Sequence, residues 1–426
     1  MTDPPHLRRS LGLWQVTVSG VGIVIGAGIY VLIGVAARDA GAGLWASFVL
    51  AALLASLTGL SYAELAGMFP AAGAEFEFAR RAFGGFAGFL AGWAMIAGNV
   101  VAAAAVAVGF AHYFREYVPL PTGTIAVGLL IVLTVIVMSG VQRSIWLSTL
   151  LVAFQIGGLV IVIAAGTPHL GDHSLVEGAT IGGVLGGTAL VFFAFIGFDE
   201  VVTLSEETRD PARVIPRALL LALAISTALY VAVGVTAVSL VGAEALAGSD
   251  RPLALVLEHD LGWGAGAVVS FIAMAATTNT SLLVLTAASR LTYAMAREGE
   301  LPATFATLSG RHAVPRVAAV AALLVAAPFA LTGQIGLVAS ATDFLIYAIF
   351  LVVNGAVIAL RFRAPEVARP FRTPWAFGRT PVLPVLALLT VVLMLAYLDR
   401  EAAGIGAAIL AVGALAGGLQ RLVSRR

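Results

Sequence analysis

Long apolar stretches separated by short polar connections run through the whole chain. Each is roughly 18 residues or longer, enough for a helix to cross a bilayer. We expect membrane-spanning helices near residues 13–36, 43–68, 84–114, 122–140, 145–166, 181–203, 217–241, 263–295, 315–332, 336–360, 381–398 and 402–422. The runs are continuous and lack the alternation of barrel strands, so the pattern predicts an all-α polytopic membrane protein with twelve transmembrane helices.

The composition agrees with this pattern. Of 426 residues, 60% are hydrophobic and 11% are charged, whereas a soluble domain has about 25% charged residues. A soluble enzyme is therefore excluded, and membrane lipid is an expected partner. A net charge of +1 gives no sign of a nucleic-acid partner. The chain has no Cys and no Lys, which excludes disulfides, thiolate metal sites and Schiff-base chemistry. We expect no cofactor and no metal.

Arginines gather on one side of the predicted membrane. When successive connections are assigned to alternate sides, only Arg38, Arg115, Arg251 and Arg400 fall on the side opposite to the N-terminus. Arginine concentrates in cytoplasmic connections. We therefore expect a multi-pass protein of the plasma (inner) membrane with residues 1–12 and 423–426 in the cytoplasm. The first span is too long for a signal peptide, so no cleaved leader is expected.

Two spans carry glycines that interrupt their helical pattern. The first contains Gly26-Ala27-Gly28, and the sixth contains Gly197 followed closely by Asp199 and Glu200. Glycine leaves helical geometry at little cost. Because the two spans stand five spans apart, they predict two inverted repeats, 13–166 and 181–360, with a substrate site at their interface. The alternative is that these glycines only let helices pack closely.

Unwound helices can bind a zwitterion with backbone groups alone. Unwinding frees amides at the start of an outer half-helix, where the partial positive charge attracts a carboxylate. It also frees carbonyls that accept hydrogen bonds from an ammonium group. The predicted site is therefore suited to an α-amino acid.

Five stretches of the sequence resemble signatures of the amino acid–polyamine–organocation (APC) superfamily, most closely its cationic-amino-acid-transporter and bacterial amino acid permease branch. They are IGAGIYVLIG, SYAELAGMFPAAGAEFEFARRAFG, FFAFIGFDEVVTLSEETRDPARVIPRAL, SRLTYAMAREGELP and ALRFRAPEVARPFRTP. The resemblance implies a five-plus-five inverted repeat of the LeuT type, discontinuous first and sixth helices, and two additional C-terminal helices within 381–422. It also implies transport by alternating access.

The resemblance assigns roles to particular positions. The amides of Gly26, Ala27 and Gly28 would hold the substrate carboxylate. The carbonyls of Val24, Phe193 and Ile196 would accept the α-amine, and Phe193 would also cover the substrate as a gate. The remaining predicted substrate-binding residues are Ile25, Gly197 and Asp199.

Two positions depart from the family pattern. Gln155 stands where many proton-linked relatives carry a lysine, and glutamine does not titrate near neutral pH. Four modes of transport therefore stay open: uncoupled exchange, facilitated diffusion, coupling to a sodium ion in that space, or protonation elsewhere. Thr277 and Thr278, in a polar cluster with Asn279 and Thr280, could supply sodium ligands or only bond between helices. Asp343 is the second departure, either a pocket residue or a residue near a helix start.

Acidic residues inside or near the spans are candidates for function. Asp199 could attract a cationic side chain or carry a coupling proton, and its structural alternative is to cap freed backbone or pair with an arginine. The same alternatives apply to Glu200. We expect Glu64 to pair with a nearby arginine.

The resulting functional prediction is a transporter of α-amino acids and not an enzyme. Small or apolar residues of the expected lining, Ala102, Ala103 and Phe344, favour neutral substrates. A carrier of cationic amino acids, polyamines or other organic cations is the alternative. A channel or a membrane-embedded enzyme is remote, because the spans hold no filter-like polar ring and no nucleophile–base pair. No feature of the sequence indicates an oligomeric state.

Overall fold

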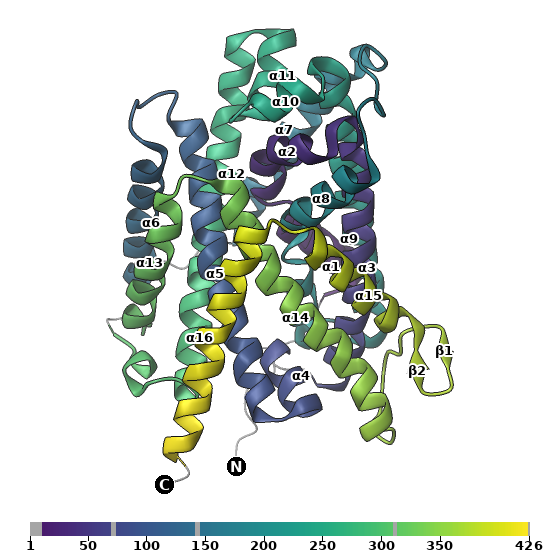
Figure 1. Cartoon of the computed structure of the whole chain (residues 1–426), viewed down its shortest axis with the longest axis vertical. Helices are drawn as coiled ribbons and strands as arrows, with labels where there is room; N and C mark the ends of the chain where they lie inside the picture. Colours follow the sequence, from purple (N-terminus) through teal and green to yellow (C-terminus); the bar gives the residue numbers. More distant parts are fainter. Residues whose placement is uncertain (1–10, 70–73, 141–144, 310–312, 425–426) are drawn as a thin grey trace.

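The computed structural model describes residues 11–69, 74–140, 145–309 and 313–424, and these form a bundle of helices (Figure 1). Eight helical segments of this described part are long and apolar enough to cross a membrane. The first of them joins α2 (Gly28–Ala40), the turn η1 (Gly41–Gly43) and α3 (Leu44–Met68). Six of the others lie in α5 (Gly85–Phe114), α6 (Thr122–Ser139), α9 (Pro211–Val241), α12 (Trp263–Arg297), α14 (Ile335–Arg363) and α16 (Arg400–Ser424), and one runs from α7 (Ile145–Gly166) to His169.

Four shorter apolar helical segments complete the bundle. They are α1 (Leu13–Val24), α8 (Ile181–Val191) with the 3-10 turn η3 (Phe192–Phe195), α13 (Arg316–Leu331) and α15 (Val382–Tyr397). Each apolar stretch predicted from the sequence falls on helix in the structure. The prediction of a largely helical, polytopic membrane protein is thus confirmed.

Short elements connect the long helices. These are α4 (Ala74–Phe83), η2 (Thr167–His169), η4 (Phe198–Glu207), α10 (Ala243–Gly248), α11 (Pro252–Leu261), η5 (Ala303–Ala306) and a hairpin of β1 (Ala376–Phe377) and β2 (Thr380–Pro381). Pro211 begins α9, in the first turn of a helix, where proline's missing N–H breaks no hydrogen bond.

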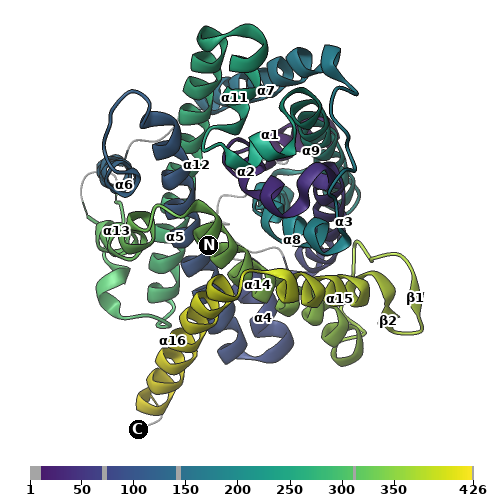
Figure 2. The same cartoon turned by 45° about the horizontal axis from the view of Figure 1, so that its top comes forward.

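Helices that stand five predicted spans apart pack against each other. The α3 helix packs on α9, α5 on α12, and α6 on α13. Figures 1 and 2 show α6 and α13 side by side at one edge, and α16 running along the outside against α5 and α14.

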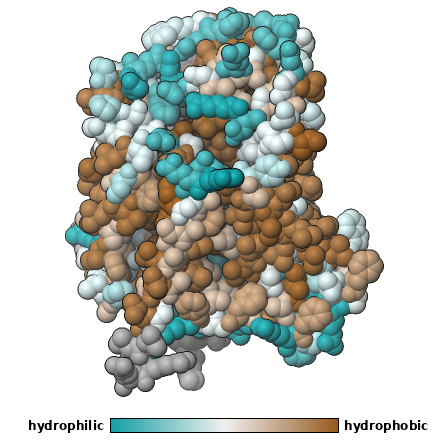
Figure 3. All heavy atoms as spheres, viewed as in Figure 1, coloured by the Kyte–Doolittle hydropathy of each residue, from teal (hydrophilic) through white to brown (hydrophobic). Residues whose placement is uncertain are grey.

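The surface has an apolar belt between two polar ends (Figure 3). Large apolar side chains of the outer helices are exposed, among them Val135 at 61%, Leu324 at 67% and Leu389 at 62%. Water would disfavour so much exposed apolar surface, whereas lipid chains suit it. In Figure 1 the lower end carries α4, the hairpin and the end of α14, which are rich in arginine, and the upper end carries α10 and α11.

Candidate functional site

The first helix break lies between α1 and α2. Helix α1 ends at Val24, α2 begins at Gly28, and the three residues between them are not helical. The amide of Gly26 turns back and donates to the Val24 carbonyl at 2.8 Å. The first amides of α2 have no intrahelical acceptor, because a helix leaves its first turn of N–H groups unpaired.

The second break lies between η3 and η4. Gly197 has a φ of +110°, which only glycine adopts readily, so the chain turns sharply here. The Gly197 amide donates to Asp199 Oδ1 at 3.2 Å. The Asp199 side chain therefore caps backbone freed by the break, which is the structural alternative considered for this acid.

The two breaks are in direct contact. A Cβ atom added to Gly28 would lie 2.5 Å from Ala194 Cα, and one added to Gly197 would lie 3.0 Å from Ile23 Cγ2. Both glycines are thus needed for close approach, and Gly197 is needed for the sharp turn as well. The paired interruption that the sequence suggested is a single contiguous region of the fold.

Two hydroxyl groups from distant helices contact the breaks. Tyr230 on α9 lies with its hydroxyl 2.9 Å from the Val24 carbonyl and 3.1 Å from the Ala194 carbonyl, one on each side of the region. On α12, Thr280 Oγ1 accepts a hydrogen bond from the Ala27 amide at 3.2 Å. Sequence reasoning missed Tyr230, because nothing in its local sequence distinguishes it from other tyrosines in apolar spans.

Some predicted substrate contacts are engaged inside the chain. The Val24 carbonyl accepts from both Gly26 and Tyr230, which uses its two lone pairs. The Ala27 amide is bonded to Thr280, and the Phe193 carbonyl accepts from the Ile196 amide at 3.3 Å. Ile25 is fully buried. A substrate that used these groups would have to replace the existing hydrogen bonds.

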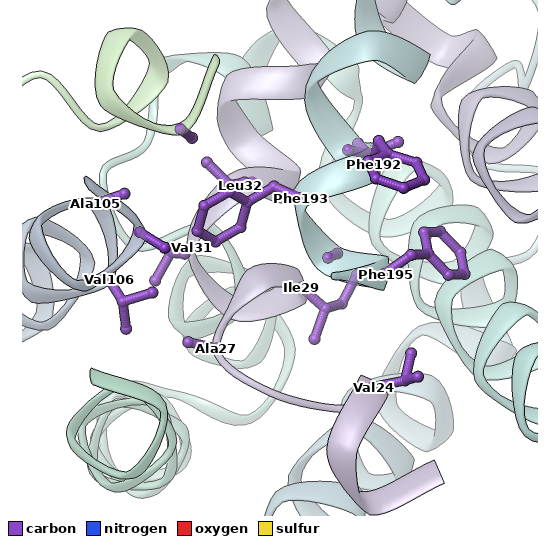
Figure 4. Close-up of a cluster of buried hydrophobic side chains, with 14 of the residues drawn as sticks. Val24, Ala27, Ile29, Val31, Leu32, Ala105, Val106, Phe192, Phe193 and Phe195 are labelled. Atoms are coloured by element: carbon purple, nitrogen blue, oxygen red, sulfur yellow. The ribbon is translucent and has the colours of Figure 1, made fainter. Parts of the chain in front are cut away.

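Phe193 lies beside the first break. Its ring points away from those of Phe192 and Phe195, towards the side on which Val31 and Ala105 lie (Figure 4). Only 6% of Phe193 is exposed. The side chain that was predicted to act as a gate is therefore covered by its neighbours.

Gln155 on α7 lies level with the first break. The Tyr30 hydroxyl donates to the Gln155 carbonyl, and Val152 packs on Gly22 on the other side of the break. Gln155 is 1% exposed, and its Nε2 atom has no hydrogen-bond partner within the described residues. A buried, unpaired amide is unfavourable and marks this position as unusual.

The threonines of α12 differ in their contacts. Thr277 donates to the Ala273 carbonyl at 2.8 Å and Thr278 to the Met274 carbonyl at 2.7 Å, both within their own helix. Thr280, of the same cluster, contacts the break directly. Among the described residues no group of three or more His, Asp or Glu side chains is placed to hold a metal ion.

A pocket of about 260 Å³ opens below the second break, between α4, α5, η4 and α12. Its polar lining consists of Glu75, Asp199, Glu200, Arg290 and Asn99. Burial first, and then the nearby Asp199, raise the pKa of Glu75, on the connecting helix α4, to about 8. Sequence reasoning missed Glu75, because an acid in an amphipathic connecting helix normally faces water.

Two further acids lie deep in the protein. Glu64 forms hydrogen bonds with Arg361 Nε at 3.0 Å and Nη2 at 2.6 Å, so the prediction that it pairs with an arginine is confirmed. Asp343 is fully buried on α14, and in the described part of the chain neither carboxyl oxygen has a hydrogen-bond partner. It lies inside α14, eight residues after the helix begins, so the helix-start alternative for Asp343 was wrong.

The sequence matches the amino acid permease family over residues 11–413. It is 31% identical to a branched-chain amino acid permease of Bacillus subtilis, over 90% of this chain and 86% of that one. A methylthioribose transporter of the same organism is also 31% identical, over 89% and 86%. A vacuolar cationic amino acid transporter of Arabidopsis thaliana is 31% identical over 85% of this chain and 61% of its own length.

Proposed function

The chain belongs to the amino acid permease family, and from this premise we propose that it is a secondary transporter that carries amino acids across the plasma (inner) membrane by alternating access. In this proposal, ten of the twelve spans form two inverted repeats, 13–166 and 181–360, and the last two spans follow in 381–422. Both termini face the cytoplasm, in agreement with the arginine distribution.

The contact between the two helix breaks is the observation that supports this function. It brings the positive end of α2 and the carbonyls around η3 to one place near the middle of the bundle. The amides of Gly28 and Ile29, in the first turn of α2, suit a carboxylate, since anions bind favourably at a helix N-terminus. The carbonyls of Val24, Phe193 and Ile196 suit an α-ammonium group.

Substrate binding in this scheme exchanges internal hydrogen bonds for bonds to the substrate. The substrate carboxylate replaces Thr280 as the acceptor of the hydrogen bond from the Ala27 amide. The substrate ammonium group replaces the Tyr230 hydroxyl as a donor to the Val24 carbonyl. In the empty site, the hydroxyl groups of Thr280 and Tyr230 thus provide hydrogen-bond partners for these backbone groups. Because the exchange conserves the number of hydrogen bonds, the net gain comes from the charge-assisted bonds of the zwitterion.

We favour neutral amino acids as substrates. Ala102 and Ala103 on α5 are small and buried, and Phe193 adds an apolar surface. Among the relatives, the Bacillus subtilis branched-chain amino acid permease agrees with this preference. A carrier of cationic amino acids or organic cations is the alternative, supported by Glu75, Asp199 and Glu200 in the pocket below the break.

We further propose that exchange does not need a proton bound at position 155. Gln155 offers no titratable group there, and the carboxyl groups of the lower pocket are the alternative place for a coupling proton. Thr277 and Thr278 keep lone pairs for a sodium ion even while they donate to their own helix.

Counterflow in proteoliposomes tests the proposal. Vesicles preloaded with unlabelled amino acids would receive labelled L-alanine or L-arginine at symmetric pH without sodium. We expect L-alanine to accumulate faster than L-arginine. Accumulation of neither, also with sodium present, together with uptake of labelled putrescine, would contradict the amino-acid function and favour an organic-cation carrier.

A further inference from the structure

A second pocket, of about 360 Å³, lies at the lower end of α14, apart from the helix breaks. It is lined by Arg361, Pro365, Val367, Arg369, Arg372 and Arg379. We call it the arginine pocket. Its volume is within the range of sites for small ligands, and its lining includes no carboxylate.

Hydrogen bonds fix two of the four arginines that line the arginine pocket. Arg369 folds back over the end of α14, where its Nη2 atom donates to the carbonyls of Leu360 at 2.9 Å and Ala364 at 3.0 Å. Arg361 is held by Glu64, and Thr373 donates to the same carboxylate from its amide at 2.7 Å. Arg361 and Arg369 therefore form a built wall of the pocket, and the exposed Arg372 and Arg379 line the rest of it.

Positive charge exceeds negative charge in this region. Of the nearby acids, Glu64 pairs with Arg361 and Arg369, and Glu366 is close to Arg369. Four guanidinium groups against two carboxylates leave two positive charges. Burial lowers the pKa of Arg369, and the neighbouring Arg361 and Arg372 lower it further against the opposing effect of Glu64. The cluster would thus be stabilised by an added anion.

Unused donors point to the kind of anion. Within the described residues, Arg361 Nη1 is buried without a hydrogen-bond partner, and neither Arg372 nor Arg379 has an ion-pair partner. Several planar donor groups around one cavity match the several acceptor oxygens of a phosphate group.

The neighbouring hairpin places this pocket at a membrane surface. Trp375 is 73% exposed and Phe377 is 84% exposed. Figure 1 shows the hairpin standing off the bundle beside α15. Tryptophan and other aromatic residues concentrate at the boundary between lipid and water. Immediately after the hairpin, α15 exposes Leu386, Leu389 and Leu393, which form an apolar track away from the pocket.

We propose that the arginine pocket binds the phosphate group of an anionic phospholipid in the cytoplasmic leaflet. The guanidinium groups contact the phosphate, Trp375 and Phe377 lie among the headgroups, and the acyl chains follow the exposed leucines of α15. A free phosphate ion would make only the contacts with the guanidinium groups. Basic pockets beside membrane helices are recognised sites for anionic headgroups.

Titration calorimetry of the full chain in detergent tests the proposal. The probes are dioctanoyl phosphatidylglycerol, dioctanoyl phosphatidylcholine and inorganic phosphate. We expect the phosphatidylglycerol to bind most tightly and to bind less tightly as salt is raised. The double variant Arg372→Gln/Arg379→Gln should weaken its binding about tenfold or more, and Phe377→Ser should weaken lipid binding but not phosphate binding.

The double variant Arg213→Gln/Arg217→Gln is the matched control. It removes the same charge from exposed arginines of α9 on the same predicted face. Equal weakening in both double variants would overturn the proposal, as would equal affinity for phosphatidylglycerol and phosphatidylcholine. Inorganic phosphate binding as tightly as the anionic lipid would overturn the lipid assignment. Because the experiment measures lipid binding, its outcome does not depend on whether the proposed transport function is correct.

Discussion

The Glu64 carboxylate forms a two-point ion pair with the Arg361 guanidinium across the contact between α3 and α14. Both side chains are almost completely buried, with 1% and 2% exposed. The pair also binds Thr373, so one carboxylate joins two helices to the segment that carries the arginine pocket.

Removing one partner of this pair should destabilise the protein strongly. Glu64→Gln leaves the Arg361 charge buried without a counter-charge, so we expect a loss of about 3–5 kcal/mol. Thermal unfolding in detergent measures it, and Glu64→Gln/Arg361→Gln should recover part of the loss. Glu77→Gln, which breaks a pair with the half-exposed Arg80 and Arg81, should lose less than about 1 kcal/mol. Equal losses would show that the buried pair has no special role.

Tyr230→Phe should affect both stability and transport. The variant leaves the Val24 and Ala194 carbonyls without their hydroxyl donor, which should lower stability by about 1–3 kcal/mol. Tyr347→Phe removes a comparable bond, to the Ala189 carbonyl at 3.1 Å, away from the breaks. Counterflow should show a changed KM for Tyr230→Phe alone. The same KM in both variants would argue against a role of Tyr230 in the site.

Gly28→Ala should abolish or greatly reduce transport. The added methyl group would lie 2.5 Å from Ala194 Cα, and a main-chain atom cannot move aside as a side chain can. Forcing the breaks apart should cost about 1–3 kcal/mol or more. Gly128→Ala on α6 meets no atom within 4 Å and serves as the control. Full counterflow activity in Gly28→Ala would disprove the importance of this contact.

Glu75 should make stability depend on pH. Its folded-state pKa is raised to about 8, by burial first and then by Asp199 and Glu200, so the folded protein prefers the protonated form. Stability from this group is fully present below about pH 4.5 and is lost as pH rises towards 8. Glu75→Gln should flatten the decline of the unfolding temperature between pH 5 and pH 8, measured against wild type.

The neighbouring acid of α4 provides the control for this pH effect. Although burial acts in the opposite direction, hydrogen bonds from Arg81 and Arg80 lower the pKa of Glu77. Glu77→Gln should therefore leave the slope in this pH range unchanged. An identical slope in wild type and Glu75→Gln would refute the assignment.

Gln155→Lys should introduce a dependence of transport on pH. The new amine would occupy a buried position beside the first break, where burial favours its neutral form and allows it to titrate. We expect uptake of labelled amino acid by the variant to respond to an imposed pH gradient, and uptake by wild type and Gln155→Met to respond less. A wild-type response equal to that of the variant would place proton coupling elsewhere.

Hydropathy alone predicted the helices well, because each span needs a continuous apolar run to cross a bilayer. The predicted span 145–166 coincides with α7, and 263–295 lies within two residues of the bounds of α12. The break near Gly26 could be anticipated, because glycine pairs weaken a helix locally. The hairpin after α14 was not anticipated, since its two-residue strands leave no periodic pattern.

The contacts around the breaks could not be predicted. Thr280 and the Ala27 amide are separated by 253 residues, and Tyr230 and Val24 by 206. Such pairs depend on how helices rotate and pack, which hydropathy does not encode. Glu75 was missed for the same reason, because its burial depends on the elements that cover α4.

Just before α1, the chain is joined to the segment that follows η4. The Leu11 amide donates to the Glu207 carbonyl at 3.0 Å, and the Arg209 amide donates to the Leu11 carbonyl at 2.9 Å. These two bonds clamp the lower ends of both interrupted helices together. Any swing of α1 away from the bundle must then carry η4 along or rupture the clamp. In the proposed alternating-access cycle, this clamp predicts that the two inner half-helices move together when the lower side opens.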